Sequence, residues 1–331
     1  MSVSADVAAA IPFLPNVCIE YHPEEFVADK VLSSALVPTY SGTYTTFSSD
    51  TAFQIYDDTM APGARANEIN WKSSLDSYIA APHGVSDHYD YDASALNPVA
   101  VNWAMVKTQN LARILKTNKE LAVIALCKAA TTYKTKTLGG YEWWTSAGVY
   151  NSNAYPIKDV QNLRTKTAMP PNFIVMGRDV FISLQNHPNV VGQRPVNRAG
   201  SINPAEMAEL FDVKEIIVSD LKYNNAGNRG RTQTLGYAWS GVFFLGYRYP
   251  DEFLGIDQIT WAAQFLVDNE DTSDGPHVSQ VMAKKDGWLI RAWEDPTRGV
   301  SGGLSLGAFH KYALKVVAYD LGCLLDMTST S

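Results

Sequence analysis

Two stretches of the sequence contain residue types at spacings that could do chemistry. Residues 299–303 read GVSGG and fit the G-x-S-x-G pattern, in which a serine nucleophile occupies a sharp turn between a strand and a helix. That mechanism needs an acidic residue and then a histidine further along the chain, whereas His310 precedes both Asp320 and Asp326. A strand-like run also follows Ser301, where a helix is required. We therefore interpret the stretch as a glycine turn, and we keep a serine hydrolase using Ser301 as an alternative that loss of ester turnover in Ser301→Ala would support.

The second stretch is a short cluster of histidine and aspartate side chains, namely His83, Asp87, His88, Asp90 and Asp92. Imidazole and carboxylate ligands suit zinc, iron or manganese. The spacing matches no metal-binding pattern, however, and polar residues are expected in the turn that we place here. The acidic residues 268–277 have a glycine at the wrong offset for a calcium loop. No catalytic residue, cofactor site or metal site is therefore predicted.

Composition narrows the class of protein further. The chain has 331 residues with 27 basic and 34 acidic side chains, a balance that argues against a dedicated nucleic-acid-binding module. The cysteines Cys18, Cys127 and Cys323 are far apart, so a disulfide framework or structural zinc site is not expected, and a reducing cytoplasm fits best. The sequence shows no secretory signal and no apolar run long enough to cross a membrane. We expect a soluble protein that is made in the cytoplasm and has no membrane partner.

The elements that position these residues begin with an extended region. Residues 1–38 have little periodicity and four prolines, which predicts an arm that lies on another surface. Residues 39–82 contain two β-prone runs on either side of a Pro-Gly turn, which predicts a long two-stranded ribbon. Such a hairpin is marginal in isolation, so it needs a neighbouring surface from its own chain or from another.

A long amphipathic helix is expected next. It begins at Asn97-Pro98, a cap followed by proline, and runs to about residue 131. On a helical wheel one face is apolar, with Trp103, Val106, Ile114, Leu121 and Ile124. The opposite face is polar, with Gln109, Lys116, Lys119 and Glu120. We expect that polar face to be in solvent, and Lys116, Lys119 and Lys128 could equally face DNA.

The most informative sequence motifs lie between residues 171 and 226. An apolar run at 173–176 is followed by Gly177 and a short helical segment that must end before Pro188. Asn203 can cap a second helix with proline at its first position, and a β-branched run at 213–219 follows that helix. Further strands are expected at 239–247 and 287–293, and as one long run at 309–325.

With the motifs VMGRDVF…NHP and INPAEMAELFDV…IIVSD, the sequence resembles tailed-phage major capsid proteins of the Hong Kong 97 fold, most closely over residues 170–250. The resemblance implies an α+β chain with five parts in order. These are an N-terminal arm (1–38), an E-loop hairpin (39–82), a P-domain (83–170) with a spine helix at 98–131, an A-domain (171–285) and a return to the P-domain (286–331).

The function implied by this resemblance is self-assembly without catalysis. Copies of the chain would form the pentamers and hexamers of an icosahedral head around double-stranded DNA, together with scaffolding, portal and decoration proteins. The chain would be synthesised in the cytoplasm of a bacterial host and end in the virion capsid. The E-loop would contact the neighbouring subunit through Tyr44, Phe47, Trp71, Lys72 and Tyr78, and Lys72 is a weak candidate for a covalent crosslink. An encapsulin-type compartment shell is the alternative within the same fold.

Overall fold

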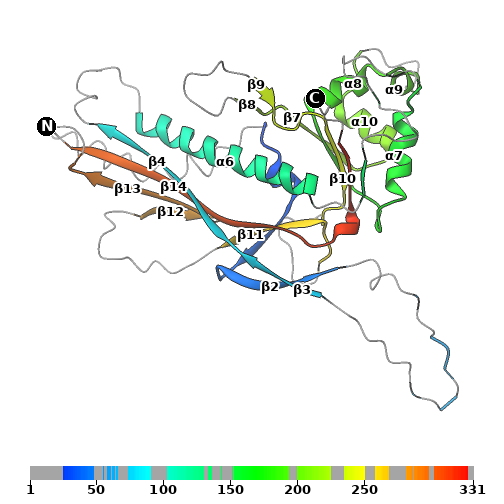
Figure 1. Ribbon diagram of the computed structural model, residues 1–331, viewed down its shortest axis with the longest axis horizontal. Coiled ribbons are helices and arrows are strands. Elements are labelled where there is room, and N and C mark those ends of the chain that lie inside the picture. Colours follow the sequence, from blue (N-terminus) through cyan, green and yellow to red (C-terminus); the bar gives the residue numbers. More distant parts are fainter. Residues whose placement is uncertain are drawn as a thin grey trace.

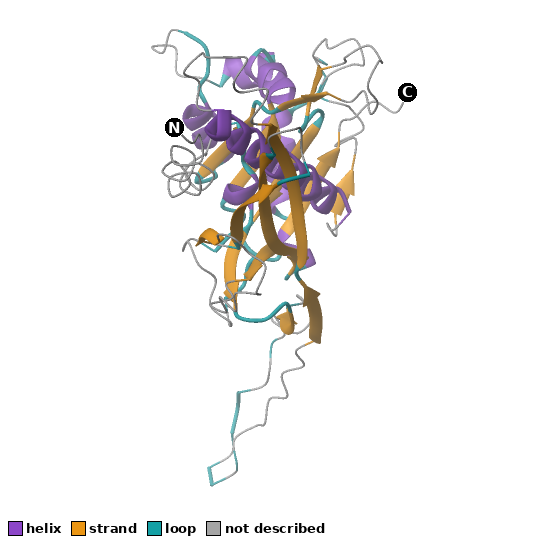
Figure 2. Cartoon of the chain, turned by 90° about the vertical axis from the view of Figure 1, so that its left-hand side faces the viewer, coloured by secondary structure: helices purple, strands orange, loops and turns teal. Residues whose placement is uncertain are grey.

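The computed structural model describes residues 25–47, 55, 58–60, 62–63, 65, 74–90, 103–129, 133–135, 143, 151, 153–193, 200–224, 235–249, 258–267, 281–285, 287–297 and 302–326. Within these residues the chain forms two larger β-sheets and two two-stranded ones, and one long helix, α6, lies against both larger sheets (Figure 1). A view turned by 90° shows the same helix crossing the strands of the larger sheet (Figure 2). No helix in this described part is long and apolar enough to cross a membrane.

The larger sheet has six strands. They run in the order β1 (Ser33–Val37), β11 (Ala262–Val267), β14 (Gly303–Val316), β13 (Trp288–Asp295) and β12 (Val281–Lys285), and β4 (Ala81–Asp90) also pairs with β14. Only the β1–β11 pair among them is parallel. The helical turn α3 (Ala28–Val31) precedes β1, so the described end of the predicted arm is built into the chain's own sheet.

Helix α6 (Trp103–Ala129) confirms the predicted long helix, whose expected first residues lie outside the description. The predicted faces are only partly right: Ile124 is buried and Leu121 packs against the core as expected, but Lys116, Lys119 and Glu120 of the predicted polar face are buried too. The buried stripe repeats every three or four positions and consists of Thr108, Leu111, Ala112, Leu115, Lys116, Lys119, Glu120, Val123, Ile124 and Cys127. Val106 and Ile114, expected in the core, are 37% and 48% exposed. Polar side chains occupy the stripe because they have partners there, and Lys116 and Lys119 are therefore not available to DNA.

The smaller sheet has five strands in the order β5 (Tyr133–Thr135), β15 (Gly322–Asp326), β10 (Val242–Gly246), β6 (Phe173–Gly177) and β7 (Glu215–Ser219). Figure 1 shows helix α6 on one side of it and four short helices on the other. Those helices are α7 (Pro156–Arg164), α8 (Arg178–Gln185), α9 (Pro188–Gly192) and α10 (Pro204–Phe211). Side chains of β6 and β10 alternate between the two covered faces, which explains why both strands read as continuous apolar runs.

The local predictions for this region are confirmed. Strand β6, helix α8 ending before Pro188, the capped helix α10 and strand β7 follow one another as expected. Asn203 Oδ1 accepts a hydrogen bond of 2.7 Å from the backbone N–H of Glu206, as an N-cap should. The short strands β8 (Lys222–Asn224) and β9 (Leu235–Tyr237) form a separate hairpin.

Removing the Asn203 cap should modestly lower the stability of the part of the chain that contains the smaller sheet. We expect Asn203→Ala to lower the free energy of unfolding by about 1 kcal/mol, since one helical N–H loses its acceptor. Urea denaturation measures the effect, and Asn203→Asp, which keeps an acceptor, serves as the control. An alanine variant as stable as the original would contradict the role of the cap.

The predicted single strand at 309–325 is wrong. Strand β14 ends at Val316, a short 3-10 helix (Tyr319–Leu321) follows, and β15 then enters the other sheet. The backbone oxygen of Trp261 accepts hydrogen bonds from Val317 N at 2.9 Å and Ala318 N at 3.1 Å, which fixes the turn. A Cβ on Gly322 would lie 2.5 Å from the Trp261 indole nitrogen. Only glycine therefore fits at this position, where the backbone runs close to the indole ring.

Candidate assembly surface and the polar cluster beneath helix α6

The predicted ribbon is formed by β2 (Ser41–Thr46) and β3 (Ser74–Ile79), which pair antiparallel. One of its faces packs on the larger sheet. The Tyr78 ring stacks on Phe265 with 4.6 Å between centroids, and the Tyr44 ring lies 5.2 Å from Phe265. The Tyr44 hydroxyl lies 2.9 Å from Asp76 Oδ2, and burial raises the pKa of this hydroxyl above its ordinary value. This inward face anchors the ribbon to its own chain.

The outward face of the ribbon has no comparable cover within the described residues. It carries Ser41, Thr43, Thr45, Leu75, Ser77 and Ile79, because side chains alternate along paired strands. Leu75 is 69% exposed and Ile79 is 74% exposed. These two exposed apolar side chains make the outward face a candidate for contact with another molecule. We name these six residues the candidate assembly surface.

The residues predicted to contact a neighbour have different positions. Tyr44, Phe47 and Tyr78 pack against the chain's own sheet, with the Phe47 N–H donating to the Val317 oxygen at 3.0 Å. Trp71 and Lys72 lie outside the described residues. Contact of these five residues with a second subunit stays a prediction. Sequence analysis missed Leu75 and Ile79, although their spacing of four places them on the same strand face as each other and opposite to Tyr78.

The histidine and aspartate cluster was expected in a turn, and that expectation is wrong. Most of it lies in β4, a strand of ten residues that pairs with β14. His83 stacks on the Tyr312 ring with 4.4 Å between centroids, while Asp87 Oδ2 lies 3.1 Å from Lys107 Nζ. Asp92 lies outside the description. Among the described residues, no group of three or more such side chains could hold a metal ion.

The proposed glycine turn lies between two paired strands. Asp295 at the end of β13 pairs with Gly303 at the start of β14, and Ser301 itself lies outside the described residues. The element after Ser301 is a strand, whereas a nucleophile elbow requires a helix there.

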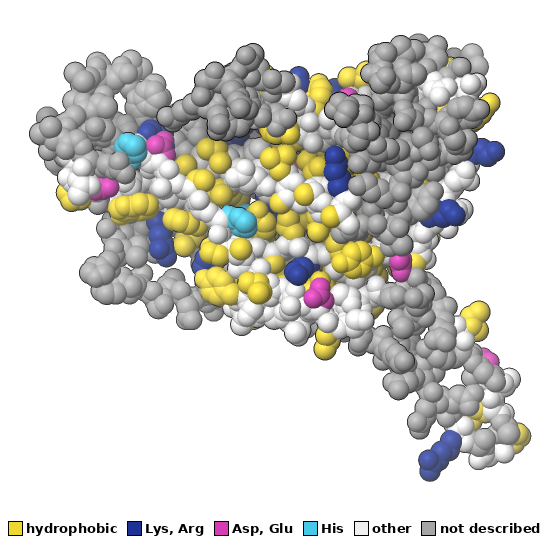
Figure 3. Space-filling model, viewed as in Figure 1, with side chains coloured by type: hydrophobic (Ala, Val, Ile, Leu, Met, Phe, Trp, Pro, Cys, Tyr) yellow, Lys and Arg dark blue, Asp and Glu magenta, His cyan; other side chains and the backbone are white. Residues whose placement is uncertain are grey.

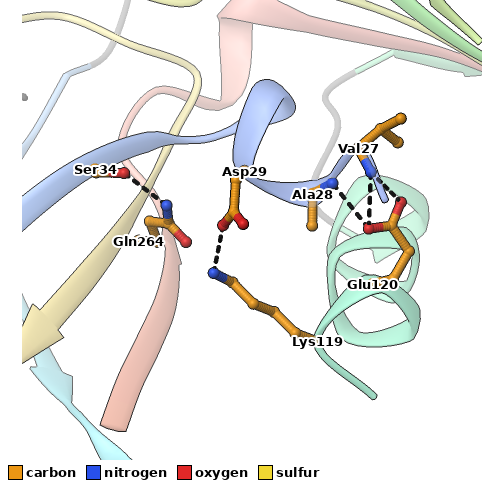
Figure 4. Close-up of polar contacts among 7 residues, drawn as sticks. All are labelled: Val27, Ala28, Asp29, Ser34, Lys119, Glu120 and Gln264. Atoms are coloured by element: carbon orange, nitrogen blue, oxygen red, sulfur yellow. Dashed lines mark hydrogen bonds and ion pairs between the residues drawn. The ribbon is translucent and has the colours of Figure 1, made fainter. Parts of the chain in front are cut away.

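Beneath helix α6 the structure brings together a set of polar groups, two of which, the side chains of Lys119 and Glu120, sequence analysis assigned to solvent (Figure 4). This polar cluster consists of Val27, Ala28, Asp29, Ser34, Lys119, Glu120 and Gln264. Lys119 and Glu120 reach from α6 toward the turn α3, where Lys119 Nζ lies 2.5 Å from Asp29 Oδ1. Gln264 Nε2 donates to Ser34 Oγ at 2.6 Å and so joins strand β11 to β1. The cluster therefore fixes the start of the described chain to the helix and the sheet.

Glu120 is the centre of this cluster and is fully buried. Its carboxylate accepts hydrogen bonds from Ala28 N at 2.8 Å, Val27 N at 3.2 Å and the Trp239 indole N–H at 2.6 Å. Burial raises the pKa of Glu120 to about 7, although the three donors act in the opposite direction. The Lys119 ammonium, paired with Asp29, lowers the pKa of that carboxyl to about 2.

The strand-Gly-Arg-Asp-helix motif has a structural role. Asp179 Oδ1 accepts from Val180 N at 2.9 Å, while Oδ2 accepts from Ser240 Oγ at 2.8 Å and Gly241 N at 2.9 Å. The carboxylate thus ties the start of α8 to the turn before β10. A Cβ on Gly177 would lie 2.3 Å from the Trp239 backbone oxygen, so only glycine permits this approach.

Taken together, the long helix on a six-stranded sheet, the helix-covered second sheet and the two-stranded ribbon define the α+β Hong Kong 97 fold of phage capsid proteins. Solved structures share this fold. A phage-related protein from Bordetella bronchiseptica is 18% identical, with a TM-score of 0.69 over 96% of this chain and 98% of that one. The capsid protein of cyanophage P-SCSP1u is 11% identical, with a TM-score of 0.53 over 89% of this chain and 85% of that one.

Sequence comparison gives a more specific likeness. The major capsid protein of Burkholderia phage BcepMu is 25% identical over 224 residues, which is 66% of this chain and 71% of the relative. An encapsulin from Synechococcus elongatus has a TM-score of 0.50, with 14% identity, over 94% of this chain and 90% of that one. No protein-family model matches the sequence. The capsid relative and the shared fold together support a phage major capsid protein.

Proposed function

We propose that this chain is the major capsid protein of a double-stranded DNA tailed bacteriophage and assembles as pentamers and hexamers into its icosahedral head. The observation that carries the proposal is the two-faced ribbon. Its inward face is anchored on the chain's own sheet through Tyr78, while Leu75 and Ile79 on the outward face remain exposed. A subunit that folds with such a face open has a surface ready for a second copy.

The energetics of a shell fit this arrangement. Fully burying one leucine or isoleucine side chain contributes about 1.5–3 kcal/mol, and in a closed shell each subunit makes the same contact. Hydrophobic side chains also extend across the middle of the face seen in Figure 3, over the strands of the larger sheet. Contacts that are individually weak can therefore hold a closed assembly when they repeat around a rotation axis.

The partition into arm, E-loop, P-domain and A-domain is part of the same proposal. So are the partners: scaffolding, portal and decoration proteins, and packaged DNA that is contacted without sequence preference. The subunit itself has a structural and not a catalytic role. In the infected cell it would be made in the cytoplasm and end in the virion.

A compartment shell of the encapsulin type has the same fold, so the contents of the particle separate the two functions. The sequence relative named as a major capsid protein favours the viral shell. Particles that package double-stranded DNA in an infected host would support the capsid. Particles that enclose a cargo enzyme and no genome would support the compartment.

The first experiment is size-exclusion chromatography and negative-stain microscopy of the full chain over a range of concentrations, with and without a candidate scaffolding protein. Closed shells, tubes or rings of five and six subunits would support self-assembly. A monodisperse monomer under every one of these conditions would contradict the proposed function.

The candidate assembly surface gives a sharper prediction. We expect the double variant Leu75→Asp/Ile79→Asp to need at least about tenfold more protein to assemble, because two buried charges would replace two buried apolar groups. Its thermal midpoint should stay close to the original, since both side chains are exposed in the single chain. Leu75→Ile/Ile79→Val is the matched control and should assemble normally. Light scattering against concentration measures both, and unchanged assembly of the aspartate variant would exclude this face from the contact.

A further inference from the structure

Strand β4 lies at an edge of the larger sheet. Among the described strands it pairs only with β14, and this pairing extends over its whole length, Ala81–Asp90. A strand at an edge presents a row of backbone N–H and C=O groups that can pair with a strand of another molecule. The backbone groups of β4 that point away from β14 therefore decide whether a second copy of the chain can add a strand to this sheet.

The direction of these groups follows from the strand on the other side of β14. The backbone N–H of Lys311 donates a hydrogen bond of 2.9 Å to the oxygen of Gly287, the residue before β13. Backbone groups alternate in direction along a strand, so those of His310 point the other way, toward its partner His83 in β4. The register between β14 and β4 has no shift. The even-numbered residues of β4 therefore point their backbone groups to the free edge.

Two of these outward positions are closed by the chain itself. Proline has no N–H, so Pro82 cannot donate to an added strand. At His88 both backbone groups have side-chain partners: its N–H donates to Asp87 Oδ1 at 2.8 Å, and its oxygen accepts from Lys107 Nζ. Lys107 belongs to the start of α6, which lies beside the end of β4 (Figure 1). Its ammonium is also 3.1 Å from Asp87 Oδ2, so one ion pair covers the end of the strand.

We propose that Asp87 and Lys107 are a gatekeeper pair, which prevents a strand of a second copy from adding to the larger sheet at β4. Between the two closed positions, only Gly84 and Ser86 point backbone groups to the edge without such a partner in the described part of the chain. Strands usually have at least about three residues, so this opening is too short for a stable pair. An added strand would also have to displace or bury the two charges of the gatekeeper pair.

Removing both gatekeeper side chains tests the proposal in the full chain. In Asp87→Ala/Lys107→Ala the backbone groups of His88 lose their partners, and the open edge extends from Gly84 to the end of β4. Thioflavin T fluorescence, which reports stacked β-strands, should rise at least about tenfold above that of the original chain at equal concentration. The thermal midpoint should change little, because a partly exposed ion pair contributes little to stability.

A proline at an open position separates edge pairing from loss of folding. Ser86→Pro, added to the double variant, removes an outward N–H that takes no part in the pairing with β14. This third change should return the fluorescence to the level of the original chain. A variant that aggregates because it is partly unfolded would not be rescued in this way. The gatekeeper pair lies within one chain, so the result does not depend on whether the chain forms shells.

Two single variants of helix α6 are the matched controls. Lys107→Arg keeps a cation with N–H donors, and Arg113→Ala removes an exposed cation that is paired with Glu25 and lies away from β4. Both should give the fluorescence of the original chain. Three results would overturn the proposal: no rise in the double variant, a rise that persists when Ser86→Pro is added, or an equal rise in Arg113→Ala.

Discussion

Gly177→Ala is expected to destabilise the chain by about 3 kcal/mol, which is a large part of the roughly 5–15 kcal/mol by which a folded protein is stable. The new Cβ would lie 2.3 Å from the Trp239 backbone oxygen and 2.6 Å from Asp179 Oδ1. Both partners are fixed, since Trp239 is fully buried and Asp179 holds the neighbouring turn through Ser240 and Gly241. No flexible side chain can move to relieve the contact. Chemical denaturation followed by tryptophan fluorescence measures the loss.

A glycine from the same helical layer is a matched control. A Cβ on Gly192, in helix α9, meets no atom within 4 Å. Alanine is a better helix former than glycine, so Gly192→Ala should be neutral or stabilising by up to about 1 kcal/mol. Equal stabilities for the two alanine variants would show that the close approach at Gly177 has no energetic consequence.

Replacing residues 48–72 with an Asn-Gly turn should abolish shell assembly while leaving a folded subunit. The replacement keeps the register in which Thr46 pairs with Ser74, and Asn-Gly favours the two-residue turn that such a hairpin needs. It also keeps Tyr44 and Tyr78, whose packing on Phe265 belongs to the subunit core. A larger deletion would remove these rings and confuse loss of folding with loss of assembly.

Two measurements on this variant separate the possible results. The thermal midpoint of the unassembled subunit should stay within a few degrees of the original, because the variant keeps the side chains that pack the ribbon on the larger sheet. Microscopy at concentrations that give shells from the original chain should show only small species. Shells of normal size would contradict a role of the loop between β2 and β3 in contacts between subunits.

The sequence was sufficient for elements that depend on neighbours along the chain. Strand β6, the capped helix α10 and strand β7 each carry a local signal: an apolar run, an Asn-Pro start and a β-branched run. The α+β fold was predictable because these sequence motifs occur in the same order as in capsid proteins of the Hong Kong 97 fold. The long helix was predictable too, since its length and composition do not depend on its partners.

The burial of the α6 side chains could not be predicted in the same way. Lys119 and Glu120 are buried because Asp29, Val27 and Ala28, about ninety positions earlier in the sequence, provide their partners. A polar residue at a buried position looks like a surface residue until that partner is known. One signal was available: Leu111, Leu115, Val123 and Cys127 repeat at helical spacing and bracket the polar residues on the same face. The break between β14 and β15 also depends on a distant residue, Trp261, against which Gly322 packs.

The proposed function would give strand β14 a mechanical role. It pairs with β4 and β13 over its first part and with β11 near its end, and it then leads directly into β15 of the other sheet. Tension along this strand acts parallel to its axis, so the hydrogen bonds to three neighbours resist it together in shear. Peeling the strand from one edge would instead break those bonds one after another. A shell wall built from such subunits would carry outward pressure along its most extensively paired strand.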